Sequence, residues 1–190
     1  MTRTTTTIAL AACATFALAG CSDDVSAPAD DPAGIRGQGV SAALEAIKGK
    51  TAVFVSRGDN SGTHKKEQSL WEAAGLPIPE KEAWYIQTGQ GMLTTINVAA
   101  ERNGYTMTDR GTYIKYEADL KGNPPLKILV EGDAVLLNQY SVMAVNPERC
   151  PKAQLELATA FSDWMAGERG QGLIGGFKLR EKQLFTPNAQ

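Results

Sequence analysis

The sequence predicts an α/β fold with a mostly parallel sheet. Short apolar runs rich in β-branched residues alternate with amphipathic segments, and 190 residues suffice for one domain with its own core. Three connections from a predicted strand to a predicted helix are polar and rich in Gly or Thr, at 56–63, 88–91 and 108–109. In a parallel sheet such connections meet at one edge, so their helices direct their N-termini at one shared cleft.

The N-terminal residues are expected to lie outside this fold. Arg3 precedes an apolar run from Ile8 to Leu18, which is typical of a secretory signal and too short to span a bilayer. The run ends in Leu18-Ala19-Gly20-Cys21, which is typical of a bacterial lipobox. We therefore expect a lipid on Cys21; the alternative is a plain cleavage site followed by a chance cysteine.

These features predict three parts of the chain: a signal peptide over 1–20, a lipid-anchored tether over 21–39 and a domain over 40–190. The tether prediction depends on composition, because residues 22–39 contain Asp, Ala, Pro and Gly with almost no large apolar side chain. Cys150 is then the only cysteine of the domain, which excludes an internal disulfide.

The domain begins with a helix over 40–47, where apolar residues recur at i, i+3, i+4 and i+7. Gly and Pro residues separate the elements that follow. The expected strands are 52–55, 84–86, 105–108, 126–130 and 139–145, and the expected helices are 63–74, 92–100, 109–113, 152–165 and 168–177. In the helix over 152–165 we expect Leu155, Phe161 and Trp164 to face the core.

The sharpest candidate for a binding site is the connection after the strand over 52–55. Arg57 follows this strand directly, and a guanidinium there is well placed for a bidentate contact with an oxyanion. Ser61-Gly62-Thr63 opens the next helix and adds hydroxyl and backbone N–H donors without adding charge. The alternative is a structural ion pair between Arg57 and Asp59, and both hold if Asp59 orients the arginine.

Other polar residues give weaker signals. The turn Thr88-Gly89-Gln90-Gly91 is either a second contact with the ligand, through Gln90 and Gly91, or an ordinary strand-to-helix turn. His64 is the single histidine and is expected to be a partly exposed residue of the first helical turn. We expect no metal site, no cofactor and no catalytic residue, because no histidine cluster and no nucleophile–base pair is visible. A net charge of −2 argues against binding to nucleic acid.

Several blocks of the sequence resemble the TupA-like proteins, the tungstate-binding lipoproteins of ABC importers. The resemblance covers about residues 31–187 and is carried by Ser56–Glu67, Trp84-Tyr85, Thr88–Met92, Tyr105–Tyr113, Leu129–Asp133, Tyr140-Ser141-Val142 and Val145-Asn146-Pro147. It implies the periplasmic-binding-protein fold of type II, in which two lobes close on a tetrahedral oxyanion without catalysis. It also implies an exported, membrane-anchored protein that delivers tungstate or molybdate to an ABC permease.

The resemblance assigns the ligand to Ser56, Arg57, Ser61, Gly62 and Thr63. It also indicates a large departure, because most of the family's first lobe has no counterpart here. We expect one lobe with C-terminal return helices, without the strand that would pair with residues 140–145. The alternative function is an internally deleted or repurposed lobe that acts as an interaction module without binding a ligand of its own.

Overall fold

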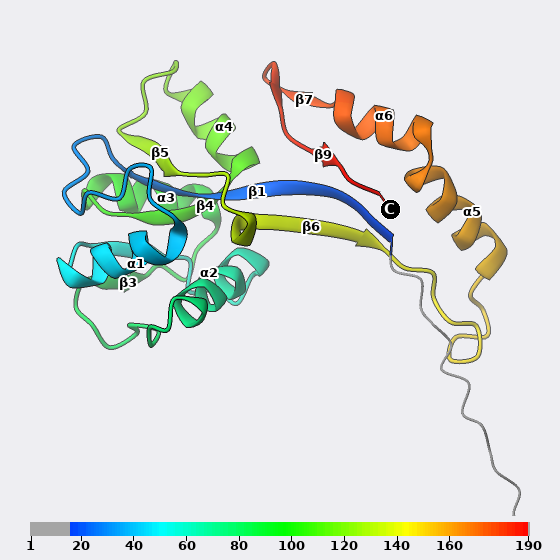
Figure 1. Cartoon of the computed structure of the whole chain (residues 1–190), viewed down its shortest axis with the longest axis horizontal. Helices are drawn as coiled ribbons and strands as arrows, with labels where there is room; N and C mark the ends of the chain where they lie inside the picture. Colours follow the sequence, from blue (N-terminus) through cyan, green and yellow to red (C-terminus); the bar gives the residue numbers. More distant parts are fainter. Residues whose placement is uncertain (1–15, 190) are drawn as a thin grey trace, which may run out of the picture.

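The computed structural model describes residues 16–189 and has helices on both faces of a mixed sheet (Figure 1). The strands are β1 (Phe16–Pro28), β2 (Phe54–Ser56), β3 (Tyr85–Gln87), β4 (Thr106–Asp109), β5 (Leu126–Val130), β6 (Leu137–Val142), β7 (Lys178–Leu179), β8 (Lys182–Gln183) and β9 (Thr186–Pro187). The helices are α1 (Val40–Gly49), α2 (Gly62–Ala73), α3 (Met92–Glu101), α4 (Arg110–Asp119), the 3₁₀ helix η1 (Ala134–Leu136), α5 (Leu155–Ala166) and α6 (Glu168–Gly176).

Strands β2, β3 and β4 form the parallel part of the structure, as the sequence predicts. β2 pairs with β3 in parallel register, and a parallel bridge between Phe54 and Tyr105 joins β2 to the start of β4. Each of the three strands leads into a helix, so the connections before α2, α3 and α4 emerge at the same edge. Helices α1 and α2 share one apolar cluster and α3 and α4 share another, which covers the two faces.

The segment predicted as a tether is part of the fold, because its residues 21–28 belong to strand β1. This strand runs antiparallel to β4 and to β5 and lies between them. Val25 and Ala27 are buried in the core of the sheet. Backbone pairing on both sides and these two small apolar side chains hold the segment in place, although its composition is that of a linker.

Residues 29–39 also belong to the folded domain. The carboxylate of Asp31 accepts hydrogen bonds from the backbone N–H groups of Gly34, Ile35 and Arg36 at 2.9–3.1 Å, and Ile35 is fully buried. The segment is therefore a compact turn instead of a flexible tether.

Residues 140–142 have a partner strand, contrary to the expectation that residues 140–145 lack one. The N-terminal half of β1 pairs with β6 from Phe16↔Val142 to Ser22↔Leu137, and Ala19 and Gly20 pair with β9. Residues 1–15, which contain most of the predicted signal peptide, lie outside the described residues. The lipid on Cys21 remains a prediction. No helix within residues 16–189 has the length and apolar character needed to cross a membrane.

The C-terminal helices leave much of their apolar surface uncovered. Leu155, Phe161 and Trp164 of α5 are 43–54 % exposed, although the sequence predicts that they face the core. Ser162 is the one residue of α5 that is buried. Within residues 16–189, no helix or strand covers this apolar surface. The apolar residues of α5 therefore recur at helical spacing without being buried.

Two neighbouring carboxylates in β1 are buried. Asp24 is fully buried and forms an ion pair of 2.7 Å with Arg110, which also pairs with Glu131. Burial raises the pKa of Asp24 to about 7, although the positive charge of Arg110 opposes the shift. Burial and the nearby Asp109 raise the pKa of Asp23 to about 6.

Replacing Asp24 with Asn should change the pH dependence of stability. Folded Asp24 holds its proton more tightly than the unfolded chain, so the wild type loses stability relative to Asp24→Asn as pH rises from about 4 to about 7. Each unit of pKa shift contributes about 1.4 kcal/mol. Urea unfolding at several pH values measures the difference, with Asp30→Asn at an exposed position as the control. A difference that is constant with pH would contradict the prediction.

Candidate functional site

The connection between β2 and α2 presents backbone donors at the start of a helix that have no partner within residues 16–189. Ser61 is the N-cap of α2, and its hydroxyl accepts the N–H of His64 at 3.4 Å. The N–H groups of Gly62 and Thr63 belong to the first helical turn, where no intrahelical acceptor exists for them. Outside its chain neighbours and its own helix, no atom lies within 4 Å of a Cβ placed on Gly62, so the space beside this residue is open. An oxyanion fits this arrangement.

Arg57 lies beside these donors and is held by Asp59. One terminal nitrogen of Arg57 lies 2.5 Å from a carboxylate oxygen of Asp59, and both side chains are about four-fifths buried. Partial burial raises the pKa of Asp59, but hydrogen bonds from Ser61 and Arg57 outweigh this effect and bring the pKa to about 2. Asp59 is therefore ionised under all ordinary conditions. This geometry fits both alternatives, a structural ion pair between Arg57 and Asp59 and an Asp59 that orients Arg57. The contact between Arg57 and an anion remains a prediction.

The hydroxyl of Ser56, which the resemblance assigns to the ligand, points instead to Glu67. Its hydroxyl is buried and donates to a carboxylate oxygen of Glu67 at 2.5 Å. The other oxygen of Glu67 accepts the hydroxyl of Tyr85 at 2.7 Å and the indole N–H of Trp71 at 3.2 Å. The hydroxyl proton of Ser56 is thus committed to Glu67 and is not available to an anion.

The turn at 88–91 packs against the Arg57 connection. The hydroxyl of Thr88 lies within 3.3 Å of the carbonyl oxygens of Ser56 and Arg57 and bridges the two turns. Gly91 is the N-cap of α3 and is exposed, as is Gln90, so both face solvent next to the connection. The structure brings these two secondary candidates near Arg57, and their contact with a ligand remains a prediction.

Gly58 allows the two turns to approach. Its φ is +62°, and a Cβ at this position would lie 2.8 Å from the Cβ of Gln87. Any other residue would therefore be strained and would also push β3 away from the connection.

His64 is the residue that sequence reasoning missed. Its side chain is buried, with 4 % exposed, instead of partly exposed. Nδ1 accepts the backbone N–H of Asn60 at 3.0 Å. A capping pattern could have indicated this role, because a polar residue three positions after a serine N-cap often bonds back to the preceding turn.

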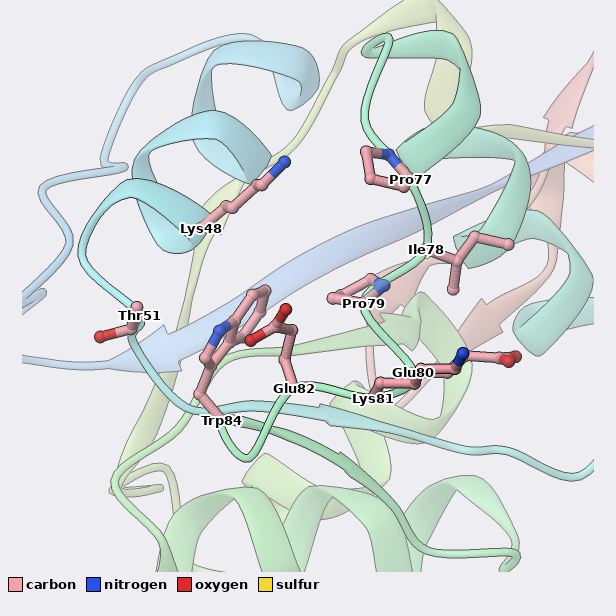
Figure 2. A pocket seen from close by; sticks show the side chains of 9 residues that line it. All are labelled: Lys48, Thr51, Pro77, Ile78, Pro79, Glu80, Lys81, Glu82 and Trp84. Atoms are coloured by element: carbon pink, nitrogen blue, oxygen red, sulfur yellow. The ribbon is translucent and has the colours of Figure 1, made fainter.

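A groove of about 430 Å³ lies elsewhere on the domain (Figure 2). Lys48, Thr51, Pro77, Pro79 and Trp84 are among the residues that line it, and the prolines face the indole across it. Thr51 and Trp84 precede β2 and β3, whereas the candidate site follows these strands. The groove is therefore at the opposite edge of the sheet. Residues 16–189 contain no cluster of three or more His, Cys, Asp or Glu residues able to hold a metal ion.

This arrangement of strands, with donors at the carboxyl edge, defines a class of protein. A model of the PBP superfamily domain matches residues 16–169, a range that begins at the first residue of β1. The chain belongs to this superfamily.

Within the superfamily, the chain belongs to the family of the TupA proteins. It is 63 % identical to the tungstate binding protein TupA from Desulfovibrio alaskensis G20, with a TM-score of 0.90 over 93 % of this chain and 71 % of that one. It is 47 % identical over 155 residues to the tungstate-binding protein TupA of Campylobacter jejuni and 42 % identical over 168 residues to that of Peptoclostridium acidaminophilum. These matches cover 82 % and 85 % of this chain but 57 % and 56 % of the two relatives, so it spans little more than half of their length.

Replacing Glu67 tests the network beneath the site. Glu67→Leu leaves the donors of Ser56, Trp71 and Tyr85 without an acceptor, and each buried donor left unpaired costs about 1–3 kcal/mol. Glu67→Gln should cost less, because its oxygen still accepts from Trp71 and Tyr85. Urea unfolding measures both losses. Glu72→Leu, at an exposed position of the same helix, serves as the control, and a loss as large as that of Glu67→Leu would contradict the role of the carboxylate.

Proposed function

We propose that the chain binds a tetrahedral oxyanion, tungstate first and molybdate next, as the extracytoplasmic solute-binding component of an ABC importer. The observation that carries the proposal is the N-terminus of α2 in the same connection as Arg57, where Asp59 accepts from both Arg57 and the N–H of Ser61. The names of the TupA relatives support tungstate as the ligand.

The donor set supports an oxyanion that carries no proton of its own. Gly62, Thr63 and Arg57 offer hydrogen-bond donors, whereas the carboxylate of Asp59 already accepts from Arg57 and from Ser61. A hydrogen phosphate needs an acceptor for its proton, and a buried proton without one is costly. Tungstate and molybdate, which are fully deprotonated dianions of similar size, need donors alone.

The proposed partners are an ABC permease and the membrane, to which a lipid on Cys21 would attach the protein. Export to the periplasm or the bacterial cell surface follows from the apolar run and the lipobox pattern of the N-terminus. The chain is also 38 % identical to the tungstate ABC transporter from Geobacter sulfurreducens, with a TM-score of 0.69 over 86 % of this chain and 67 % of that one. Neither an enzymatic activity nor a nucleic-acid partner is part of the proposal.

Calorimetry with tungstate, molybdate, sulfate and phosphate tests the function directly. We expect heat with tungstate and molybdate and weaker or no heat with phosphate. Arg57→Ala should weaken tungstate binding at least about tenfold, because a charge-assisted hydrogen bond contributes about 1.5–3 kcal/mol. Arg102→Ala, at an exposed site at the end of α3, is the matched control. No heat with any of the four anions at high protein concentration would refute the proposal for this chain.

Replacing Gly62 separates ligand binding from folding. Gly62→Ala meets no atom within 4 Å, and alanine favours a helix over glycine by up to about 1 kcal/mol, so stability should be equal or higher. The added methyl group occupies the space where the anion would approach the backbone, so tungstate affinity should fall. Gly49→Ala at the end of α1 also meets no atom within 4 Å and should leave affinity unchanged. Equal affinities for both variants would place the ligand elsewhere.

A further inference from the structure

The single histidine occupies an unusual position for a residue of a helix start. His64 is the third residue of α2, it is 4 % exposed, and its ring contacts Asn60 in the connection that carries Arg57. Most side chains in a first helical turn point to solvent, whereas this one is enclosed. Among residues 16–189, Nε2 has no hydrogen-bond partner, so the specific contact of the ring is through Nδ1.

His64 makes two hydrogen bonds to the segment before it, one with Ser61 and one with Asn60. The backbone N–H of His64 donates to the hydroxyl of Ser61 at 3.4 Å, and Nδ1 of His64 accepts the backbone N–H of Asn60 at 3.0 Å. This pattern corresponds to a capping box, in which a Glu or Gln at the same helical position reaches back to the preceding turn. Here an imidazole takes the place of the carboxylate or amide, and it reaches one residue further back.

The contact restrains a residue with unfavourable backbone geometry. Asn60 has a φ of +59°, in the left-handed region, which costs most residues about 1 kcal/mol or more. An acceptor for its N–H at 3.0 Å offsets this cost and holds the peptide plane. The following N–H, that of Ser61, donates to Asp59 at 3.1 Å.

The two bonds determine which backbone donors remain for a ligand. The N–H groups of Asn60 and Ser61 are used inside the connection, whereas those of Gly62 and Thr63 have no acceptor within residues 16–189. Loss of the bond to His64 would leave the N–H of Asn60 without this acceptor, in the connection that also carries Asp59 and Arg57.

We propose that His64 is a positioning residue for the oxyanion site. Its unprotonated Nδ1 holds Asn60 in the left-handed conformation and thereby keeps Arg57, Gly62 and Thr63 in a converging arrangement. The inference rests on the proposed function for its ligand, whereas the contact itself can be tested without one. In this role the neutral ring of His64 carries its proton on Nε2, and His64 does not contact the anion.

Nitrogen-15 spectroscopy of the wild-type chain tests the contact directly. Because the chain contains 1 histidine, its two ring nitrogens can be assigned without ambiguity. At mildly alkaline pH we expect an unprotonated Nδ1 and a protonated Nε2. A ring with its proton on Nδ1 would overturn the proposal, because such a ring cannot accept from Asn60.

Two substitutions then link the contact to the site. His64→Asn keeps an oxygen close to the position of Nδ1, whereas His64→Phe keeps the ring and removes the acceptor. His64→Phe should speed hydrogen exchange of the Asn60 amide and weaken tungstate binding, each by about tenfold, as expected for one hydrogen bond. His64→Asn should stay close to wild type in both measurements. Equal losses in the two variants would assign the effect to ring packing and would overturn the proposal.

The outcomes distinguish this inference from the proposed function. A wild type that binds no tungstate refutes the proposed function, while the tautomer and the Asn60 exchange rate still decide whether His64 holds the connection. A wild type that binds tungstate, with His64→Phe binding equally well, refutes the positioning role alone. If His64→Phe fails to fold, the wild-type tautomer and His64→Asn still decide, because loss of binding in a folded His64→Asn would count against the role of the acceptor.

Discussion

The candidate site depends on one buried carboxylate beneath it. Glu67 of α2 accepts hydrogen bonds from Ser56 at the end of β2, from Tyr85 at the start of β3 and from Trp71 one turn further along its own helix. Burial raises the pKa of Glu67 and the three donors oppose the shift. A carboxylate in the interior is tolerated only when it is well paired, so this one group fixes α2 against both strands. The distance from Arg57 to the first turn of α2 follows from that anchor.

The parallel half of the fold could be predicted from the sequence because its signals are local. The strands are short runs of β-forming residues, and each is followed by a residue that commonly caps a helix: Ser61, Gly91 or Asp109. Strand β1 could not be predicted in this way. Its residues show no alternation, and it becomes a strand because β4, β5 and β6 pair with it from positions far along the chain. Such pairing leaves little trace in the segment itself.

The residues of the candidate site likewise divide into those that could be predicted from the sequence and those that could not. The sequence was sufficient to place Arg57 beside Ser61, Gly62 and Thr63, because all four lie on one short connection. It was insufficient for Ser56 and His64, whose roles depend on which way a side chain turns. Ser56 turns inward to Glu67, and His64 turns back to Asn60. Both directions are set by packing between α2 and the sheet, which periodicity alone does not determine.

Strand β1 also has a consequence for protein maturation. Cleavage before Cys21 would remove the residues that pair with β9, Ala19 and Gly20, and would leave two of the six pairs with β6, Cys21↔Asn138 and Ser22↔Leu137. The pairs with β4 and β5 involve residues 23–28 and would survive, so the half of the domain with the candidate site would keep its sheet. A lipid on Cys21 would then be joined to the sheet with no spacer, which would hold the domain against the bilayer surface.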